Sequence, residues 1–349
     1  MRANQPNMWR SMLRPALFAA LVMVFLLYIP TPYVVYEPGI VEKAGPMVNV
    51  AYADPQGRGS FMLTTVQLSN ANFWTVARTW WADDMLLVRK SELLGGRSPT
   101  EYAERLVTIM HNSQSNAIEA AYRQTGIEYR IEPLELIVTD VAELGEAGFR
   151  PGDVLIELDG MPIRSADELA QQMTALRAGQ ALHWRIRRGS TEQELTTSVS
   201  ADLSAAQAID LPRLFGVQLA QVRDLVPSHK GWKVSIESGS IGGPSAGLIF
   251  ALQILDELTA GDLTGGRRIA GTGTIGPDGV VGPIGGVGLK VVAAARSGAA
   301  LFLAPGPNYE EAARKAEAIG TDMQIVAADT LGEAIAALGE DARRQVGRR

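Results

Sequence analysis

Ser245 is the residue whose surroundings first suggest chemistry. It lies in the run GGPSAG, directly before an apolar segment with helical periodicity. A hydroxyl at a helix N-terminus meets unpaired backbone N–H groups and the positive end of the helix dipole, which favour the charge of a tetrahedral oxyanion. We therefore count Gly243, Pro244, Ala246 and Gly247 as supporting residues of a candidate site. A serine that only caps the helix has the same local sequence, so the run alone leaves both interpretations open.

A serine nucleophile needs a base, and the familiar arrangements are excluded by residue order. The pattern G-x-S-x-G around Ser245 also fits the nucleophile elbow of α/β-hydrolases, whose catalytic histidine follows the serine in the chain. Here His111, His183 and His229 all precede Ser245. The S-x-x-K pattern of β-lactamases is absent as well, because no lysine has a serine three positions before it. A base of another kind is required.

Lys290 is the candidate for that base. It follows the run PIGGVGL at the start of a predicted helix whose other residues are apolar. A lysine accepts a proton near neutral pH only if its pKa falls from about 10.4 to about 7 or 8, a shift of roughly 4 kcal/mol. Burial among apolar groups beside a positive helix end favours such a shift. A lysine that extends its amine to solvent is the alternative.

Taken together, residues 232–338 resemble the proteolytic domain of the Lon peptidase family, and more closely its membrane-anchored, PDZ-containing branch. The resemblance rests on GPSAG around Ser245, the TG pair at Thr272, PIGG ending at Gly286, and a lysine four residues later. It implies a ribosomal S5 domain 2-like α/β fold and a catalytic Ser245–Lys290 dyad. It also implies that the Thr272 hydroxyl orients the lysine amine, and that the substrate is an extended peptide.

The chain departs from ATP-dependent Lon in ways that bear on function. Gly242 stands where that family has Asp, and Thr274 where it has Glu. No G-x-x-x-x-G-K-[ST] run exists in the chain, so we expect an ATP-independent peptidase that cuts flexible or unfolded polypeptides. The G-x-G-x-x-G at residues 271–276 is followed by a Pro-Asp-Gly turn, where a dinucleotide site needs a helix. We expect no cofactor and no metal site, and read Asp83-Asp84 as a solvated loop.

A second resemblance lies in the middle of the chain. The segment Phe149–Leu169 is similar to the second half of a PDZ domain, with a GD turn before a strand and a DG turn leading toward a helix. Ser165 and Glu168 predict a capping box for that helix, which we expect to extend to about Arg177. PDZ domains bind a peptide as an added strand, with a glycine-rich loop holding its carboxylate. No such loop precedes the strand here, so peptide capture and a purely structural role both stay open.

The N-terminal segment Leu17 to Val35 has an uncharged apolar composition and about the length that a bilayer-spanning helix requires. Arginines precede it and glutamates follow, so the positive-inside rule predicts a cytosolic N-terminus and an extracytoplasmic remainder at the cell membrane. The first small-residue cleavage pattern, Ala51-Tyr52-Ala53, lies far beyond the apolar run. We therefore predict an uncleaved single-pass anchor in preference to a signal peptide or a buried core helix.

The predicted architecture is α+β and multidomain. We expect a cytosolic tip and anchor over 1–36, a β-rich region with an amphipathic helix from Pro99 to Gln124 over 37–126, a PDZ-like β-sandwich over 127–203, and a Lon-like domain over 204–345. Within the last, residues 267–286 predict one hairpin turned by Asp278-Gly279.

The bulk composition excludes several functions. The 32 basic and 38 acidic residues give a net charge of -6 without long runs of one sign, which argues against nucleic acid as a partner. The absence of cysteine excludes thiol chemistry and disulfides. The expected partners are a peptide or protein substrate and the membrane, with a homo-oligomer among the options. The alternative function is a non-catalytic scaffold that binds peptides through its PDZ-like domain.

Overall fold

The computed structural model describes residues 8–53, 57–95, 97–141, 148–173, 176–177, 179–199, 215–239 and 243–346. Its helices are α1 (Met8–Tyr28), α2 (Phe73–Arg78), α3 (Lys90–Leu94), α4 (Pro99–Thr125), α5 (Ala166–Gln172), α7 (Gly247–Leu258), α8 (Val287–Arg296), α9 (Gly306–Ala318) and α10 (Leu331–Val346). The predicted boundary at residues 203/204 and the substituted Gly242 lie outside the described residues.

The strands form two large sheets and two small ones. They are β1 (Pro30–Lys43), β2 (Val48–Val50), β3 (Ser60–Asn72), β4 (Leu86–Arg89), β5 (Tyr129–Val141), β6 (Val154–Leu158), β7 (Met161–Pro162), β8 (Ala181–Arg188), β9 (Thr191–Ser198), β10 (Val217–Pro227), β11 (Val234–Ile236), β12 (Arg268–Gly271), β13 (Thr274–Ile275), β14 (Val281–Gly282), β15 (Leu301–Ala304) and β16 (Gln324–Ala327). The larger sheets have the orders β16-β15-β12-β3-β1-β4 and β10-β5-β6-β8-β9.

The first large sheet joins segments that are far apart in the sequence. Its strand β3 pairs with β12 in parallel, from Ser60 beside Arg268 to Leu63 beside Gly271. Phe61 and Leu63 are fully buried in the same core as Leu248 and Ile249 of α7. The packing therefore differs from the predicted division into a β-rich region over 37–126 and a separate Lon-like domain over 204–345. Strand β3 is a central strand of the sheet that carries the later segment.

The predicted hairpin over 267–286 is only partly correct. The turn at Asp278-Gly279 does join two short strands, β13 and β14, which pair Thr274 with Gly282 and Ile275 with Val281. Strand β12, however, lies between β3 and β15 in the large sheet. Its residues Ile269 and Ala270 are buried on both faces, as is usual for a parallel strand.

The second large sheet and helix α5 enclose their own core. Leu155, Leu158, Leu169, Leu182 and Ile186 are buried there together. Strands β8 and β9 form an antiparallel hairpin. The Ser165 hydroxyl accepts a hydrogen bond from the Glu168 backbone N–H at 3.1 Å, but the Glu168 carboxylate accepts from the backbone of Arg164, so the capping box is only half formed. Helix α5 ends at Gln172, before the predicted Arg177.

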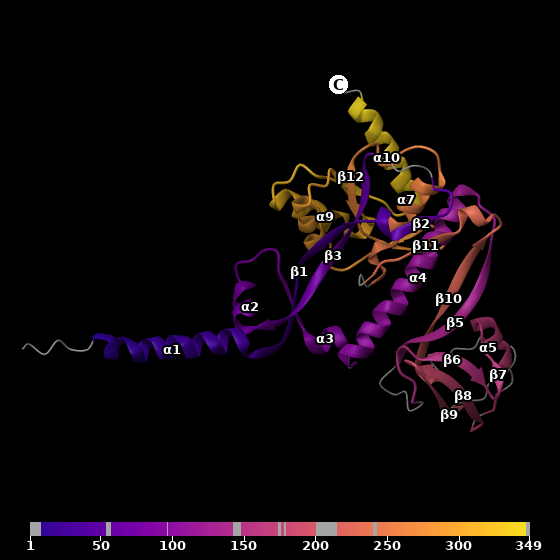
Figure 1. The fold of residues 1–349 in the computed structure, drawn as a ribbon, viewed down its shortest axis with the longest axis horizontal. Helices are drawn as coiled ribbons and strands as arrows, with labels where there is room; N and C mark the ends of the chain where they lie inside the picture. The colour runs from indigo at the N-terminus through magenta and orange to yellow at the C-terminus, as the bar shows by residue number, and fades with distance from the viewer. Residues whose placement is uncertain are drawn as a thin grey trace, which may run out of the picture.

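Helix α4 connects the two sheets (Figure 1). It spans Pro99–Thr125, which confirms the predicted amphipathic helix, and Ser98 and Glu101 form a complete capping box at its start. Its buried face contacts α7 on one side and β10 on the other. Helix α4 is therefore packed against both halves of the molecule.

Helix α1 projects away from the rest of the molecule (Figure 1). The predicted membrane span Leu17 to Val35 is not one element, because the helix ends at Tyr28 and β1 begins at Pro30. A proline lacks the backbone N–H that a helix interior needs, and Val34 and Val35 are instead buried in the sheet. Within the part of the chain that the structure describes, no helix combines the length and the apolar character needed to cross a bilayer.

Candidate active site

Ser245 occupies a short turn that leads into α7. The turn is a 3-10 helix, Pro244–Ala246, in place of the predicted α-helical N-terminus, and α7 begins at Gly247. Gly243 precedes the turn at φ 95, a conformation that favours glycine, and Pro244 suits the first position of a helix because its φ is already helical. Ser245 itself is partly exposed. Ser245 therefore lines a pocket at the start of a buried helix.

The small residues after Ser245 allow close packing of the turn. Ala246 is buried, and a Cβ at Gly247 would lie 2.8 Å from both Ser113 Oγ and Ile275 Cγ2. Any larger residue at position 247 would push the turn away from α4 or from β13. Pro244 has no N–H, and the N–H groups of Gly247 and Leu248 donate to the carbonyls of Pro244 and Gly273. The candidate donors to an oxyanion are therefore the N–H groups earlier in the turn, from Ser245 onward.

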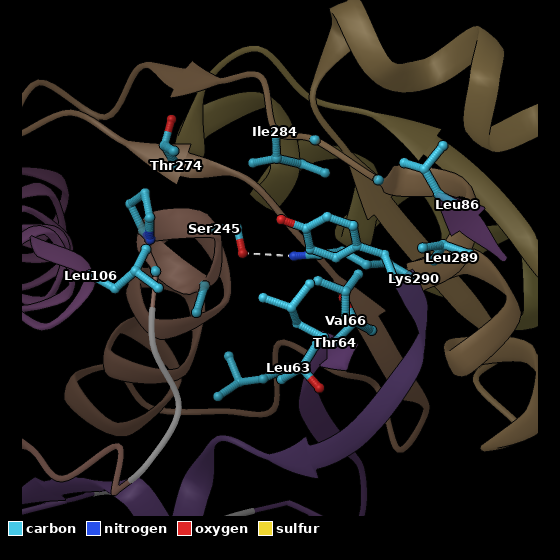
Figure 2. A pocket seen from close by; sticks show the side chains of 18 of the residues that line it. Leu63, Thr64, Val66, Leu86, Leu106, Ser245, Thr274, Ile284, Leu289 and Lys290 are labelled. Carbon is cyan, nitrogen blue, oxygen red and sulfur yellow. Dashed lines mark hydrogen bonds between the residues drawn. The ribbon is translucent and has the colours of Figure 1, made fainter. Parts of the chain in front are cut away.

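Lys290 lies in the first turn of α8 and points at Ser245 (Figure 2). Gly286 caps this helix with a left-handed φ of 70. Lys290 Nζ lies 2.6 Å from Ser245 Oγ and 2.9 Å from Thr272 Oγ1, both within hydrogen-bond distance. The residue is only 3% exposed, so the lysine does not extend its amine to solvent. The sequence prediction that these two side chains meet agrees with this geometry.

The surroundings of Lys290 favour its neutral form. Burial lowers the pKa of Lys290 from 10.5 to about 8. None of the described residues that line the adjoining pocket is acidic, so no carboxylate there offsets the cost of desolvating an ammonium group. An amine with such a pKa is partly neutral near physiological pH and can accept a proton.

Thr272 fixes the position of the amine. Its side chain is fully buried, and its hydroxyl donates a hydrogen bond to the Ser245 carbonyl at 3.0 Å. Because the single hydroxyl proton is used in that bond, Thr272 Oγ1 faces Lys290 Nζ as an acceptor. The backbone N–H of Gly273 donates to the same Ser245 carbonyl at 2.8 Å. One residue thus orients the lysine and holds the serine turn together.

A cavity of about 710 Å³ opens beside the Ser245–Lys290 pair. Figure 2 shows Leu63, Thr64 and Val66 on one side of the pair, with Thr274 and Ile284 on the other. The wall is predominantly apolar, and its described lining residues are Tyr36, Ile40, Leu63, Thr64, Thr65, Val66, Leu68, Leu86, Tyr102, Leu106, Gly243, Pro244, Ser245, Ala246, Thr274, Pro283, Ile284, Gly285, Gly286, Leu289 and Lys290. Strands β1 and β3 therefore form one wall, which sequence reasoning assigned to a different domain.

Helix α4 supplies polar contacts to the site that sequence reasoning missed. Ser113 Oγ donates to the Pro244 carbonyl at 3.0 Å, and Asn116 Nδ2 donates to the Ile275 carbonyl at 2.9 Å. Ser113 is 4% exposed. Polar residues on the apolar face of an amphipathic helix were the available signal, but their partners cannot be identified from sequence alone.

Other residues singled out in the sequence take no part in this site. His111 is exposed on α4. The Asp84 carboxylate pairs with Arg296 at 2.6 Å, and the Asp83 carbonyl accepts from Lys315. The G-x-G-x-x-G run leads into the β13–β14 hairpin where a dinucleotide site would need a helix.

Comparison with protein families identifies two regions of the chain. Residues 228–339 match the model of the Lon protease (S16) C-terminal proteolytic domain, and residues 112–199 match a PDZ domain model. The chain combines a PDZ domain with a Lon-type proteolytic domain. The match to the Lon-type domain contains Ser245, Thr272 and Lys290, and it supports a serine peptidase. The sheet of that domain also includes β1 and β3, which lie outside the matched residues.

Individual relatives are distant. The magnetosome formation protease MamE of Paramagnetospirillum magneticum is 26% identical over 137 residues, which cover 39% of this chain and 19% of that protein. The chain thus spans about a fifth of the length of this curated relative. Among solved structures, the PDZ domain of an SdrC-like protein from Listeria monocytogenes is 19% identical over 24% of this chain and 86% of its own, with a TM-score of 0.20. The second domain of a Listeria protein is 20% identical to this chain. The match covers 26% of this chain and 83% of that domain, with a TM-score of 0.19.

Proposed function

We propose that this chain is an ATP-independent serine endopeptidase in which Ser245 is the nucleophile and Lys290 the general base. The observation that carries the proposal is the 2.6 Å approach of Lys290 Nζ to Ser245 Oγ, made by a lysine that is only 3% exposed. A serine is activated when a base lies within hydrogen-bond reach of its hydroxyl and a third group orients that base. Thr272 is the orienting residue.

The proposed reaction has two stages. Neutral Lys290 accepts the Ser245 proton as Oγ attacks the peptide carbonyl carbon, and backbone N–H groups at the start of the turn stabilise the oxyanion. The resulting ammonium then gives its proton to the leaving amine, which departs and leaves an ester on Ser245. In the second stage Lys290 takes a proton from water as the water oxygen attacks the ester carbonyl carbon. The bond to Ser245 Oγ then breaks, Lys290 returns the proton to Oγ, and the peptide leaves with a new C-terminal carboxyl group.

The proposed substrate is an extended and flexible polypeptide. The chain has no nucleotide-binding run of the G-x-x-x-x-G-K-[ST] type that would indicate ATP-driven unfolding. The apolar wall formed by Leu63, Val66 and Ile284 favours an aliphatic or aromatic side chain beside the scissile bond. We expect unfolded proteins to be cut and folded ones to be spared.

The test is the variant Ser245→Ala, assayed against an unfolded protein and a set of fluorogenic peptides. We expect complete loss of cleavage with an unchanged circular dichroism spectrum, while Ser228→Ala, at an exposed serine, should retain full activity. A serine-directed acylating reagent should modify the parent chain at Ser245. If purified Ser245→Ala still cuts the substrates of the parent, the assignment of the nucleophile is wrong.

The alternative is a non-catalytic scaffold that binds peptides. The match of residues 112–199 to a PDZ domain model supports this alternative. A scaffold would bind unfolded polypeptide without turnover and would not react with acylating reagents. The same assays therefore separate the two functions.

We further propose an extracytoplasmic location with contact to the membrane through α1. Arg10 and Arg14 lie before the apolar part of this helix, while Leu17, Phe18 and Leu21 are largely exposed on it. Protease added to intact cells, compared with lysed cells, would reveal on which side the later domains lie. Digestion only after lysis would contradict the proposed location.

A further inference from the structure

The loop of residues 283–286 connects the β13–β14 hairpin to helix α8 and belongs to the cavity wall. It lies outside every described strand and helix, and each of its residues lines the cavity beside Ser245 and Lys290. Gly286, its last residue, caps the helix that carries Lys290. A displacement of this loop would therefore move one wall of the cavity relative to the catalytic pair.

Asn308 holds this loop through the backbone of Ile284. Its Oδ1 accepts from the Ile284 N–H at 2.9 Å, and its Nδ2 donates to the Ile284 carbonyl at 3.0 Å. A neighbouring antiparallel strand makes the same two bonds to one residue, so the side-chain amide takes the place of a strand here. Among side chains, only those of Asn and Gln carry an acceptor oxygen and a donor nitrogen on one carbon. The backbone of Ile284 is therefore fixed although it belongs to no strand.

Asn308 itself lies in a well-packed part of the molecule. It is 8% exposed and belongs to the first turn of α9, which follows the fully buried strand β15. Its backbone N–H donates to the Pro305 carbonyl at 2.8 Å. Ala312 of α9 and Val287 of α8 share one core, and Ile284 packs against that core. The amide is thus offered to the loop from a fixed position.

The side chain of Ile284 is the part of this arrangement that a substrate can meet. Figure 2 shows Ile284 on the opposite side of the Ser245–Lys290 pair from strand β3, and it lines the cavity. Asn308 is not among the described residues that line the cavity. An effect of Asn308 on a bound peptide therefore has to pass through Ile284.

We propose that Asn308 is a positioning residue of the peptidase, which holds Ile284 in the cavity wall so that an apolar substrate side chain packs against it beside the scissile bond. This inference rests on the proposed function. Without the two hydrogen bonds the wall can recede, and a peptide that packs against it is misplaced relative to Ser245. A displacement of about 1 Å can cost on the order of 100-fold in rate. A substrate with a small side chain at this position makes less contact with Ile284 and depends less on the clamp.

Two fluorogenic peptides that differ only in a leucine or an alanine on the acyl side of the cleaved bond test the proposal. We expect the parent to prefer the leucine peptide, and Asn308→Ala to lower kcat/KM for it by about tenfold or more while the preference falls toward one. The pH at which kcat/KM is half-maximal should stay that of the parent, because neither hydrogen bond involves Lys290. Glu310→Gln, at an exposed position of the same helix, should behave as the parent does.

A double-mutant cycle shows whether Asn308 acts through Ile284. The variant Ile284→Ala should lose the preference for leucine to a similar extent, and the double variant with Asn308→Ala should lose little more, because the two residues act as a unit. Additive losses, an equal loss for both peptides, or a parent without a preference for leucine would overturn the proposal.

Hydrogen exchange of the parent chain gives a measurement that depends neither on the folding of a variant nor on activity. The backbone amide of Ile284 should be protected as strongly as those of β12, because it exchanges only when the clamp opens. Exchange at the rate of exposed loops would overturn the proposal. Cleavage that persists in Ser245→Ala would instead contradict the proposed function, while a protected Ile284 amide would still show the clamp, so the two failures are distinguishable.

Discussion

A lysine amine accepts a proton only while it is neutral, so the proposed role of Lys290 depends on how the protein lowers the pKa of its amine. Burial is the cause, and it lowers the pKa of the amine to about 8. The two hydroxyls that contact Nζ, those of Ser245 and Thr272, carry no charge that would restore the ammonium form. At pH 7 about one lysine in ten is then ready to act as a base.

The pH dependence of cleavage should reflect this titration. The value of kcat/KM should rise with pH and level off above about 8, because only the neutral amine can deprotonate Ser245. Thr272→Val removes an acceptor that stabilises the ammonium form, so its midpoint should fall to lower pH while kcat drops by about 10- to 100-fold. Thr272→Ser should recover most of the rate. A profile that is flat from pH 6 to 10 would contradict the role of Lys290.

Replacing the buried lysine should also change stability in a pH-dependent way. Its pKa is about 8 in the folded chain and 10.5 when exposed, so the unfolded chain binds more protons between these values and stability rises with pH there. Below pH 8 the full penalty applies, on the order of 3 kcal/mol. Lys290→Met avoids it but loses hydrogen bonds, so we expect a gain of about 1–3 kcal/mol at pH 7.

Urea unfolding of parent and Lys290→Met at pH 7 and at pH 10 measures this difference. The advantage of the variant should shrink toward pH 10, where the parent amine is neutral in the folded chain. Lys43→Met, at an exposed position, should show no such trend. A variant that is less stable than the parent at pH 7 would mean that the site stabilises a charged amine.

Helix α4 contacts the turn that carries Ser245, although the helix lies outside residues 228–339, which match the Lon-type proteolytic domain. Ser113 holds the Pro244 carbonyl directly before Ser245, at 3.0 Å, and is buried against the turn. Ser113→Ala should therefore lower kcat by about tenfold or more, through misplacement of Ser245 Oγ, with little change in KM. The reactivity of Ser245 toward an acylating reagent should fall in parallel.

The matched control for this prediction is His111→Ala, which changes an exposed residue of the same helix. It should leave kcat and KM unchanged. A Ser113→Ala variant that loses stability but keeps its kcat would assign Ser113 a packing role only.

The elements also show what sequence reasoning can reach. The contact of Lys290 with Ser245 and Thr272 was predictable because the resemblance rests on short glycine-rich motifs around them. Helix α4 was predictable from its apolar periodicity. The placement of β12 could not be predicted. The local sequence pattern does not reveal whether a buried strand pairs with its neighbour in sequence or, as here, with β3 and β15. The contact of Ser113 with Pro244 depends on the same long-range packing.

The proteolytic half of the molecule is assembled from both ends of the chain. Strands β1, β3 and β4 complete the sheet of β12, β15 and β16, and the PDZ sheet is inserted between α4 and the later segment. Because β3 is central, the second half has no complete core without the first. The sheet order therefore makes a prediction about fragments of the chain.

A fragment of residues 215–346, which contains Ser245 and Lys290, should not fold alone. It would expose the edge of β12 and the apolar surface that Phe61 and Leu63 cover, and such edges aggregate. Coexpression with residues 30–128 should restore a soluble complex and part of the cleavage activity, since the two pieces together supply the whole sheet. Size-exclusion chromatography and the peptide assay measure both effects. As a control, the same fragment is coexpressed with residues 129–199, which supply PDZ strands in place of β3, and this pair should stay insoluble and inactive. A 215–346 fragment that is soluble and active alone would show that the N-terminal strands are dispensable.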